Sequence, residues 1–174
     1  CFKIIKNLTD NNIKVFFRPH PRSLKINKKI IKDLLTFFKN HKYFNYNPSM
    51  SSVENMLESN VMISDWSGAA IEYAIVFRKP VLFIDTPQKI KNNEYYKINI
   101  EPLEKTIRSQ IGHILSPDKI QNTYKEVIKL NEFNDLQKFN FNYIYEKNYY
   151  NPNNSEEFCA KEIYNLYNKW VKFF

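Results

Sequence analysis

A polar turn at residues 64–68 carries the side chains best suited to chemistry, which are Ser64, Asp65, Ser67 and Gly68. The turn follows an apolar run and opens an apolar helix, so we expect its hydroxyls and the free N–H groups of Gly68, Ala69 and Ala70 to face one point. The helix dipole makes that point attractive to an anion such as phosphate. The turn therefore predicts a phosphate site. The alternative is that Ser64 and Ser67 only cap the helix.

Glu72 is the second candidate, because it is the only charged residue in the apolar helix predicted for residues 68–77. We expect this helix to be buried, and a buried carboxylate needs a partner because an unpaired charge is costly away from water. A ribose diol would be one such partner, which favours a nucleotide as the ligand. A salt bridge to an arginine or a lysine is the alternative.

The third candidate is Arg18-Pro19-His20-Pro21, directly after the strand predicted for residues 13–17. The two prolines are expected to keep the backbone around His20 extended and rigid. A rigid histidine just past a strand end lies on the ligand-binding edge of a parallel sheet, and Arg18 lies beside it. The alternative is that His20 is a solvated loop residue.

These candidates are positioned by strands and helices that alternate along the chain. Apolar runs predict strands at residues 13–17, 44–46, 61–63 and 81–84. Apolar residues at helical spacing predict helices at residues 2–8, 27–41, 51–58, 68–77, 103–115 and 117–130, and a final helix from Ser155. Residues 131–154 show no clear period and are expected to be irregular. The fold class is therefore α/β, a Rossmann-like doubly wound parallel sheet with extra C-terminal helices.

Length and composition limit the class of protein. The 174 residues suffice for one domain, and a chain that begins with Cys1 is expected to be a piece of a longer protein. Two cysteines are too few for a disulfide scaffold, and no apolar run reaches the ~20 residues of a membrane span, so the expected location is the cytoplasm. No residue spacing indicates a metal site. The net charge of +8 favours contact with an anionic membrane surface or polymer.

The motifs together resemble the CDP-glycerol glycerophosphotransferase family, whose members build teichoic-acid-type polymers. The resemblance rests on Arg18-Pro-His-Pro21, on residues 63–72 (Ile-Ser-Asp-Trp-Ser-Gly-Ala-Ala-Ile-Glu) and on residues 79–85 (Lys-Pro-Val-Leu-Phe-Ile-Asp). It implies the GT-B architecture, in which two Rossmann-like lobes enclose the active site. Residues 1–130 would then be the C-terminal, nucleotide-donor-binding lobe, and residues 131–174 would pack on it. The N-terminal acceptor lobe would be absent, and the chain alone would be inactive.

The resemblance also implies a role for each candidate residue. His20 matches the family's catalytic or phosphate-binding histidine, and Glu72 matches an acidic residue near the ribose. The turn at residues 64–68 matches the turn that holds the donor's phosphates, and Arg18 and Ala69 are expected to support it. Gly68 replaces the family's second serine, which removes a hydroxyl but keeps the backbone N–H group, so the choice of donor stays open.

The implied reaction is attack by a polymer hydroxyl on the phosphorus next to glycerol, with release of CMP. The donor would be CDP-glycerol or a related CDP-polyol, and the acceptor a polyol phosphate or a glycan. No cofactor beyond this donor is expected, and the sequence leaves a requirement for Mg²⁺ open. The protein would work at the inner face of the cell membrane as a peripheral protein.

Two other functions remain open at this point. The same lobe could transfer a sugar from a UDP- or CMP-sugar, because phosphate-binding residues alone do not separate these donors. A basic module that binds polyanions would also explain the charge and the 16% of aromatic residues. No nucleic-acid recognition motif accompanies that charge, so no nucleic acid is expected as a partner.

Overall fold

The larger sheet is built around residues 62–84, which fold as strand, helix and strand. The computed structural model describes residues 1–46, 53–88, 90, 92, 94–132, 139–151 and 153–171. β3 (Met62–Ser64) and β4 (Val81–Ile84) are joined by α5 (Gly68–Phe77). They pair in parallel, with Met62 opposite Val81. The predicted unit of two parallel strands and one connecting helix is confirmed.

β4 is the central strand of this sheet. β5 (Gly112–Leu115) pairs in parallel with its other edge, which gives the order β3-β4-β5. α5 contacts β3, α7 (Arg108–Ile111) contacts β4, and α8 (Thr123–Asn131) contacts both β4 and β5. All four residues of β4 are buried. This is the expected pattern for a parallel strand that helices cover on both faces.

β1 (Val15–Phe17) and β2 (Phe44–Tyr46) form a separate parallel sheet. α3 (Lys28–Phe38) lies between them in the chain. The core of this part is made of the following side chains: Ile5, Leu34 and Phe38, with Val15, Phe17, Leu35 and Phe44 packed against them. The single doubly wound sheet that the sequence predicts is thus divided into two hydrogen-bonded sheets. The observed class is α/β with parallel sheets, which is compatible with a Rossmann-like lobe.

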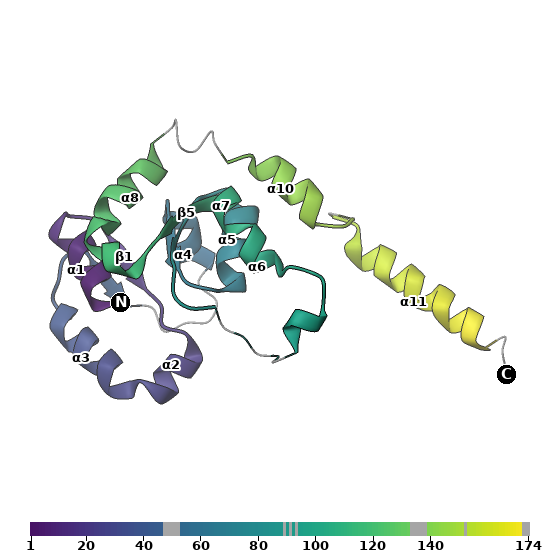
Figure 1. Cartoon of the computed structure of the whole chain (residues 1–174), viewed down its shortest axis with the longest axis horizontal. Coiled ribbons are helices and arrows are strands. Elements are labelled where there is room, and N and C mark those ends of the chain that lie inside the picture. The colour runs from purple at the N-terminus through teal and green to yellow at the C-terminus, as the bar shows by residue number, and fades with distance from the viewer. Residues whose placement is uncertain are drawn as a thin grey trace. The chain divides into compact units, whose positions relative to one another are not determined.

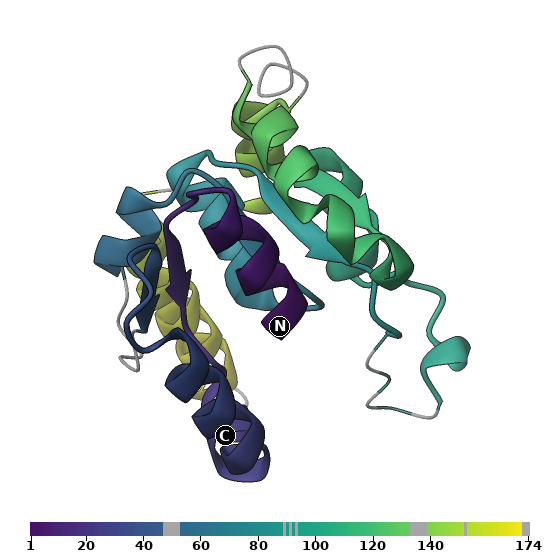
Figure 2. The ribbon, with the colours of Figure 1, turned by 90° about the vertical axis from the view of Figure 1, so that its left-hand side faces the viewer.

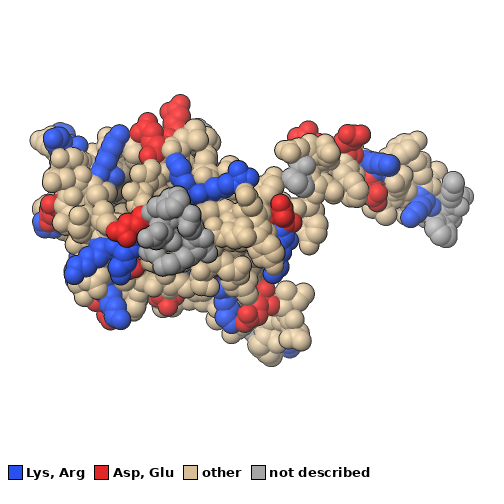
Figure 3. All heavy atoms as spheres, turned by 90° about the horizontal axis from the view of Figure 1, so that it is seen from above, with Lys and Arg blue, Asp and Glu red and all other residues tan. Residues whose placement is uncertain are grey.

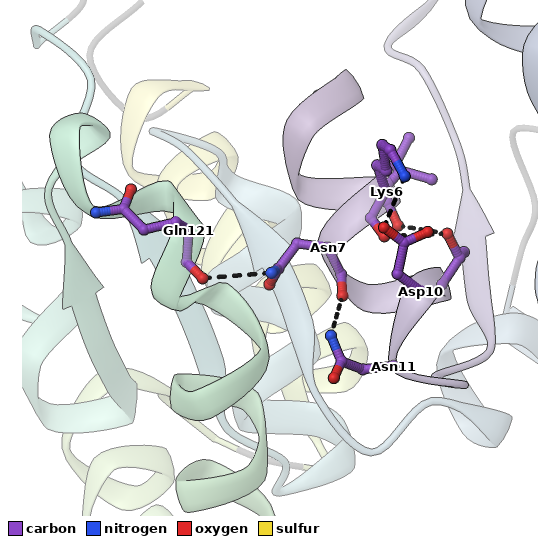
Figure 4. Close-up of polar contacts among 7 residues, drawn as sticks. Lys6, Asn7, Asp10, Asn11 and Gln121 are labelled. Carbon is purple, nitrogen blue, oxygen red and sulfur yellow. Dashed lines mark hydrogen bonds and ion pairs between the residues drawn. The ribbon is translucent and has the colours of Figure 1, made fainter.

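α1 (Phe2–Asp10) links the two sheets, because it contacts both β1 and α8 (Figure 2). Asn7 makes the polar part of this link (Figure 4). Its Nδ2 donates to the carbonyl of Gln121 at 3.3 Å, and its Oδ1 accepts from the backbone N–H of Tyr124 at 2.8 Å. Tyr124 is the second residue of α8, where N–H groups lack partners within the helix. Asn7 therefore caps α8 from another helix.

The remaining described elements are labelled in Figure 1 where there is room. They are α2 (Pro21–Ile26), α4 (Val53–Glu58), η1 (Tyr95–Lys97), α6 (Leu103–Thr106), η2 (Pro117–Asn122), α10 (Phe141–Asn148) and α11 (Ser155–Val171). The chain divides into two compact units, at residues 1–140 and 141–174. The five strands of the described residues belong to the first unit, and the second contains α10 and α11.

Three predicted segments differ from the structure. The continuous helix expected at residues 103–115 is wrong, because α6 and α7 are short and β5 begins at Gly112. A Cβ atom on Gly112 would lie 1.7 Å from the carbonyl oxygen of Val81, so the two strands approach closely there. The backbone around His20 was expected to be extended. His20 itself is extended, but α2 begins at Pro21, since proline suits the first position of a helix. α10 lies inside the stretch expected to be irregular.

Candidate functional site

The turn at residues 64–68 joins the carboxyl end of β3 to α5. Ser67 is the N-cap residue of α5 and has extended backbone angles (φ −136°, ψ 129°). Its hydroxyl makes no capping hydrogen bond to the helix, so the capping alternative does not describe Ser67. The N–H group of Ala70 donates to the carbonyl of Ser67 at 3.1 Å, and Ala70 is fully buried. The expectation that Ala70 offers a free N–H group is therefore wrong.

Gly68 and Ala69 carry the N–H groups that the start of α5 leaves for a ligand. Gly68 is exposed and Ala69 is half-buried. A Cβ atom built on Gly68 would meet nothing within 4 Å. The space beside this part of the turn is thus open, and a phosphate oxygen could approach the backbone. Asp65 in the same turn is half-buried.

Glu72 does not occupy the environment that the sequence predicts. It is exposed, as is Val76 one helical turn later, so α5 has an exposed face and Glu72 needs no buried partner. The orientation of α5 is set by Tyr73, whose ring is fully buried and whose hydroxyl donates to the carbonyl of Ser59 at 2.8 Å. Burial raises the pKa of the Tyr73 phenol, so it remains a hydrogen-bond donor. Glu72 remains a candidate only as an exposed group near the helix start.

A cluster behind the turn was missed by the sequence analysis. The indole Nε1 of Trp66 donates to the carbonyl of Thr86 at 2.7 Å. The guanidinium carbon of Arg108 lies 4.1 Å from the centre of the Trp66 ring and 5.1 Å from that of Phe83. Arg108 Nη1 donates to Asp85 Oδ1 at 3.1 Å. The cluster thus joins the middle of the turn to the end of β4 and to the start of α7.

His20 follows β1 and serves as the N-cap residue of α2. Its Nδ1 accepts a hydrogen bond from the backbone N–H of Arg22 at 3.1 Å. Since an accepting nitrogen carries no proton, a neutral His20 in this position has its proton on Nε2. The side chain is exposed, so Nε2–H can donate to a ligand oxygen. In this form His20 is a hydrogen-bond donor and not a base.

The structure brings only part of the candidate set together. Ser64 is the last residue of β3, in the three-stranded sheet, and Ser67, Gly68 and Ala69 follow it where the turn leads into α5. Arg18 and His20 follow β1, in the two-stranded sheet, and Arg18 is exposed. Both groups thus lie just past the carboxyl end of a parallel strand, where α/β proteins bind ligands.

Other kinds of site find little support in the described residues. No group of three or more His, Cys, Asp or Glu side chains in this part of the chain is placed to hold a metal ion. Of the helices described, none is both long and apolar enough to cross a membrane. On the face drawn in Figure 3, Lys and Arg side chains are interspersed with Asp and Glu, which does not favour a polyanion-binding surface there.

Comparison with known proteins agrees with the resemblance seen in the sequence. The family model described as CDP-glycerol:poly(glycerophosphate) glycerophosphotransferase matches residues 2–102. This range includes β1 to β4, and with them His20 and the turn, whereas Arg108 lies beyond it. No curated protein and no solved structure matches the chain. The family implies a transferase that uses a nucleotide-activated donor and an acceptor, and the chain belongs to this glycerophosphotransferase family.

Proposed function

We propose that this chain is the donor-binding lobe of a glycerophosphotransferase that uses CDP-glycerol or a related CDP-polyol. The observation that carries the proposal is the start of α5. There the Ser67 hydroxyl makes no capping bond and Gly68 is open to a ligand, in a chain of this family. A helix start with unused N–H groups and a nearby hydroxyl can bind the phosphate oxygens of a nucleotide.

In the proposed reaction, a hydroxyl oxygen of the acceptor forms a bond to the phosphorus next to glycerol. The bond from that phosphorus to the bridging oxygen breaks, and CMP leaves with the electron pair. The N–H groups of Gly68 and Ala69 and the Ser67 hydroxyl would hold the phosphates and stabilise the charge that develops on them. The Nε2–H group of His20 would donate to a phosphate oxygen. The base that takes the hydroxyl proton would come from the N-terminal lobe.

Calorimetric titration with CDP, CMP and UDP tests the proposal. The wild-type chain is compared with Ser67→Ala, which removes the hydroxyl, and with Val76→Ala, which changes an exposed residue on the same helix. We expect saturable binding of CDP, weakened at least about tenfold in Ser67→Ala, since a hydrogen bond to a charged group contributes roughly 1.5–3 kcal/mol. Val76→Ala should bind as the wild type does.

The titrations also separate the competing donors. A clear preference for UDP over CDP would refute the CDP-polyol donor and favour a sugar transferase. Equal binding by the wild type and Ser67→Ala would show that the turn does not hold the phosphates. Glu72→Ala adds a separate probe, because contact with the ribose requires a loss of affinity shared by CDP and CMP; a loss for CDP alone would exclude that contact.

A further inference from the structure

The buried polar atoms without a partner gather in one place. Among the described residues, the buried side-chain nitrogen and oxygen atoms without a hydrogen-bond partner are Thr86 Oγ1, Arg108 Nε and Arg108 Nη2. Thr86 and Arg108 both belong to the cluster behind the turn, because Thr86 accepts from Trp66 and Arg108 stacks on the same ring. Buried polar atoms are nearly always satisfied in proteins, so such a concentration indicates a functional role.

Arg108 is also a cation whose charge is incompletely offset. Its side chain is 5% exposed, whereas the carboxylate of its partner Asp85 is 51% exposed and thus largely in contact with water. The two side chains share a single contact, through Nη1, although a guanidinium carries five N–H donors. Aromatic rings cover much of the remaining group. A buried cation with so little compensation creates a positive potential around it.

The position of Trp66 carries that potential to the turn. Trp66 lies between Ser64 and Ser67, and one face of its ring rests on the guanidinium, 4.1 Å from ring centre to Cζ. Its Nε1–H group, at the edge of the ring, donates to the carbonyl of Thr86 at 2.7 Å and fixes the orientation of the ring. The turn is therefore held in place through Trp66, and a fixed positive charge lies 4.1 Å from the centre of the Trp66 ring.

We propose that Arg108 is a positioning residue for the phosphate site of the turn, and that its charge makes this site select a diphosphate over a monophosphate. The inference rests on the proposed function, in which the turn binds the phosphates of the donor. It adds a residue outside the segment that the family model matches. Arg108 holds Trp66, and the anion gains from the guanidinium charge without touching it.

Two substitutions separate charge from shape. Arg108→Met keeps an unbranched side chain but removes the charge, and Arg108→Lys keeps the charge but loses the planar group that stacks on Trp66. Each is made in a Trp170→Phe background, so that the fluorescence of Trp66 alone reports binding. The probes are CDP, CMP and inorganic pyrophosphate, and thermal unfolding of each variant is recorded alongside.

We expect Arg108→Met to bind pyrophosphate and CDP about tenfold more weakly or worse, because it removes a poorly compensated, buried positive charge from beside the turn that would hold the anion. The loss for CMP should be smaller, so the ratio of CDP to CMP affinity falls. Arg108→Lys should keep most of this ratio. A folded Arg108→Met variant with an unchanged CDP to CMP ratio would overturn the inference, because a purely structural role lowers both affinities alike.

A third variant covers the case in which Arg108→Met does not fold. Asp85→Asn removes the half-exposed carboxylate, so the charge of Arg108 is less neutralised and pyrophosphate should bind several-fold more tightly. Unchanged or weaker binding of pyrophosphate would refute the inference. The wild type separates the two proposals. If it binds pyrophosphate but not CDP, the proposed donor is wrong and the anion site stands. If it binds CDP and Arg108→Met does so equally well, only the role of Arg108 is wrong. Binding of neither ligand overturns both.

Discussion

Replacement of His20 tests whether this histidine binds phosphate or only shapes the chain. In the structure it does two separable things: Nδ1 caps α2 by accepting from Arg22, and Nε2–H is directed away from that bond and is available to a ligand. His20→Asn keeps a cap, because asparagine is among the best N-cap residues and accepts from the same N–H group. Its side chain is shorter than that of histidine, so its amide N–H groups do not reach the position of Nε2–H. His20→Ala removes both.

The expected magnitudes follow from these contacts. His20→Asn should change the free energy of unfolding by no more than about 0.5 kcal/mol, because an equivalent cap remains. His20→Ala should lose about 1 kcal/mol of stability with the cap. Both should weaken CDP binding about tenfold, taking a charge-assisted hydrogen bond at the low end, about 1.5 kcal/mol, since His20 is exposed.

His41 provides a matched control, because its Nδ1 also accepts from the N–H group two residues later, Tyr43, at 3.4 Å. CDP binding is measured by calorimetry and stability by urea unfolding, for His20→Asn, His20→Ala and His41→Asn. His41→Asn should leave CDP affinity unchanged. If His20→Asn binds CDP as tightly as the wild type, the histidine is only a cap and the phosphate role is refuted.

Four further predictions concern the scaffold and the turn. Gly112→Ala should destabilise the protein by roughly 3 kcal/mol or more in urea unfolding, because its Cβ would lie 1.7 Å from the Val81 carbonyl oxygen. A loss of stability below about 1 kcal/mol would show that β4 and β5 separate easily there. Gly68→Ser, by contrast, should unfold within about 0.5 kcal/mol of the wild type, since its Cβ meets nothing within 4 Å. Asn7→Ala should cost about 2 kcal/mol, one cap and one hydrogen bond, and an unchanged unfolding midpoint would contradict the link between α1 and α8. Burial acts to raise the pKa of the Glu126 carboxyl, but hydrogen bonds from Lys129 and His113 outweigh it and lower that pKa. The stability that Glu126 contributes should therefore be present above its unfolded pKa of 4.5 and be lost as the pH falls below that value. Glu126→Gln should flatten this part of the profile of unfolding free energy against pH.

The parts of the fold that the sequence predicts well are those that local pattern determines. The run Val81–Ile84 is apolar at every position, and its strand is buried at every position. The helix before it begins at Gly68, directly after Ser67, as predicted, although the Ser67 hydroxyl makes no capping hydrogen bond. β5 was missed because four residues at the end of a helical pattern carry too little periodicity to separate a strand from a helix.

The candidate site shows the same division. The turn at residues 64–68 has local signals and lies where the sequence predicts, at the end of a parallel strand. The exposure of Glu72 depends on how α5 is rotated, which the burial of the Tyr73 ring and its hydrogen bond to Ser59 decide. Arg108 has no local signal at all, since it meets Trp66 across 42 positions of sequence and only the pairing of β4 with β5 brings α7 to the turn.

The two glycines of this chain separate what the fold requires from what a ligand would require. Gly112 has extended backbone angles that any residue can adopt, so the reason for glycine there is the lack of room against β4. Gly68 has room for a side chain, and a glycine at the start of a helix gains nothing in stability over serine. Packing therefore explains Gly112 and leaves Gly68 unexplained. Because the family's turn resembles this one but has serine at this position, phosphate binding alone does not require glycine. A ligand that comes closer to the N–H group in this chain supplies a reason, since a side chain at residue 68 would occupy the open space beside that group. If Gly68→Ser folds normally but loses CDP affinity, the glycine is needed for the ligand to bind. If the variant binds CDP as tightly as the wild type or more tightly, the added side chain is tolerated and the phosphate does not lie in the open space.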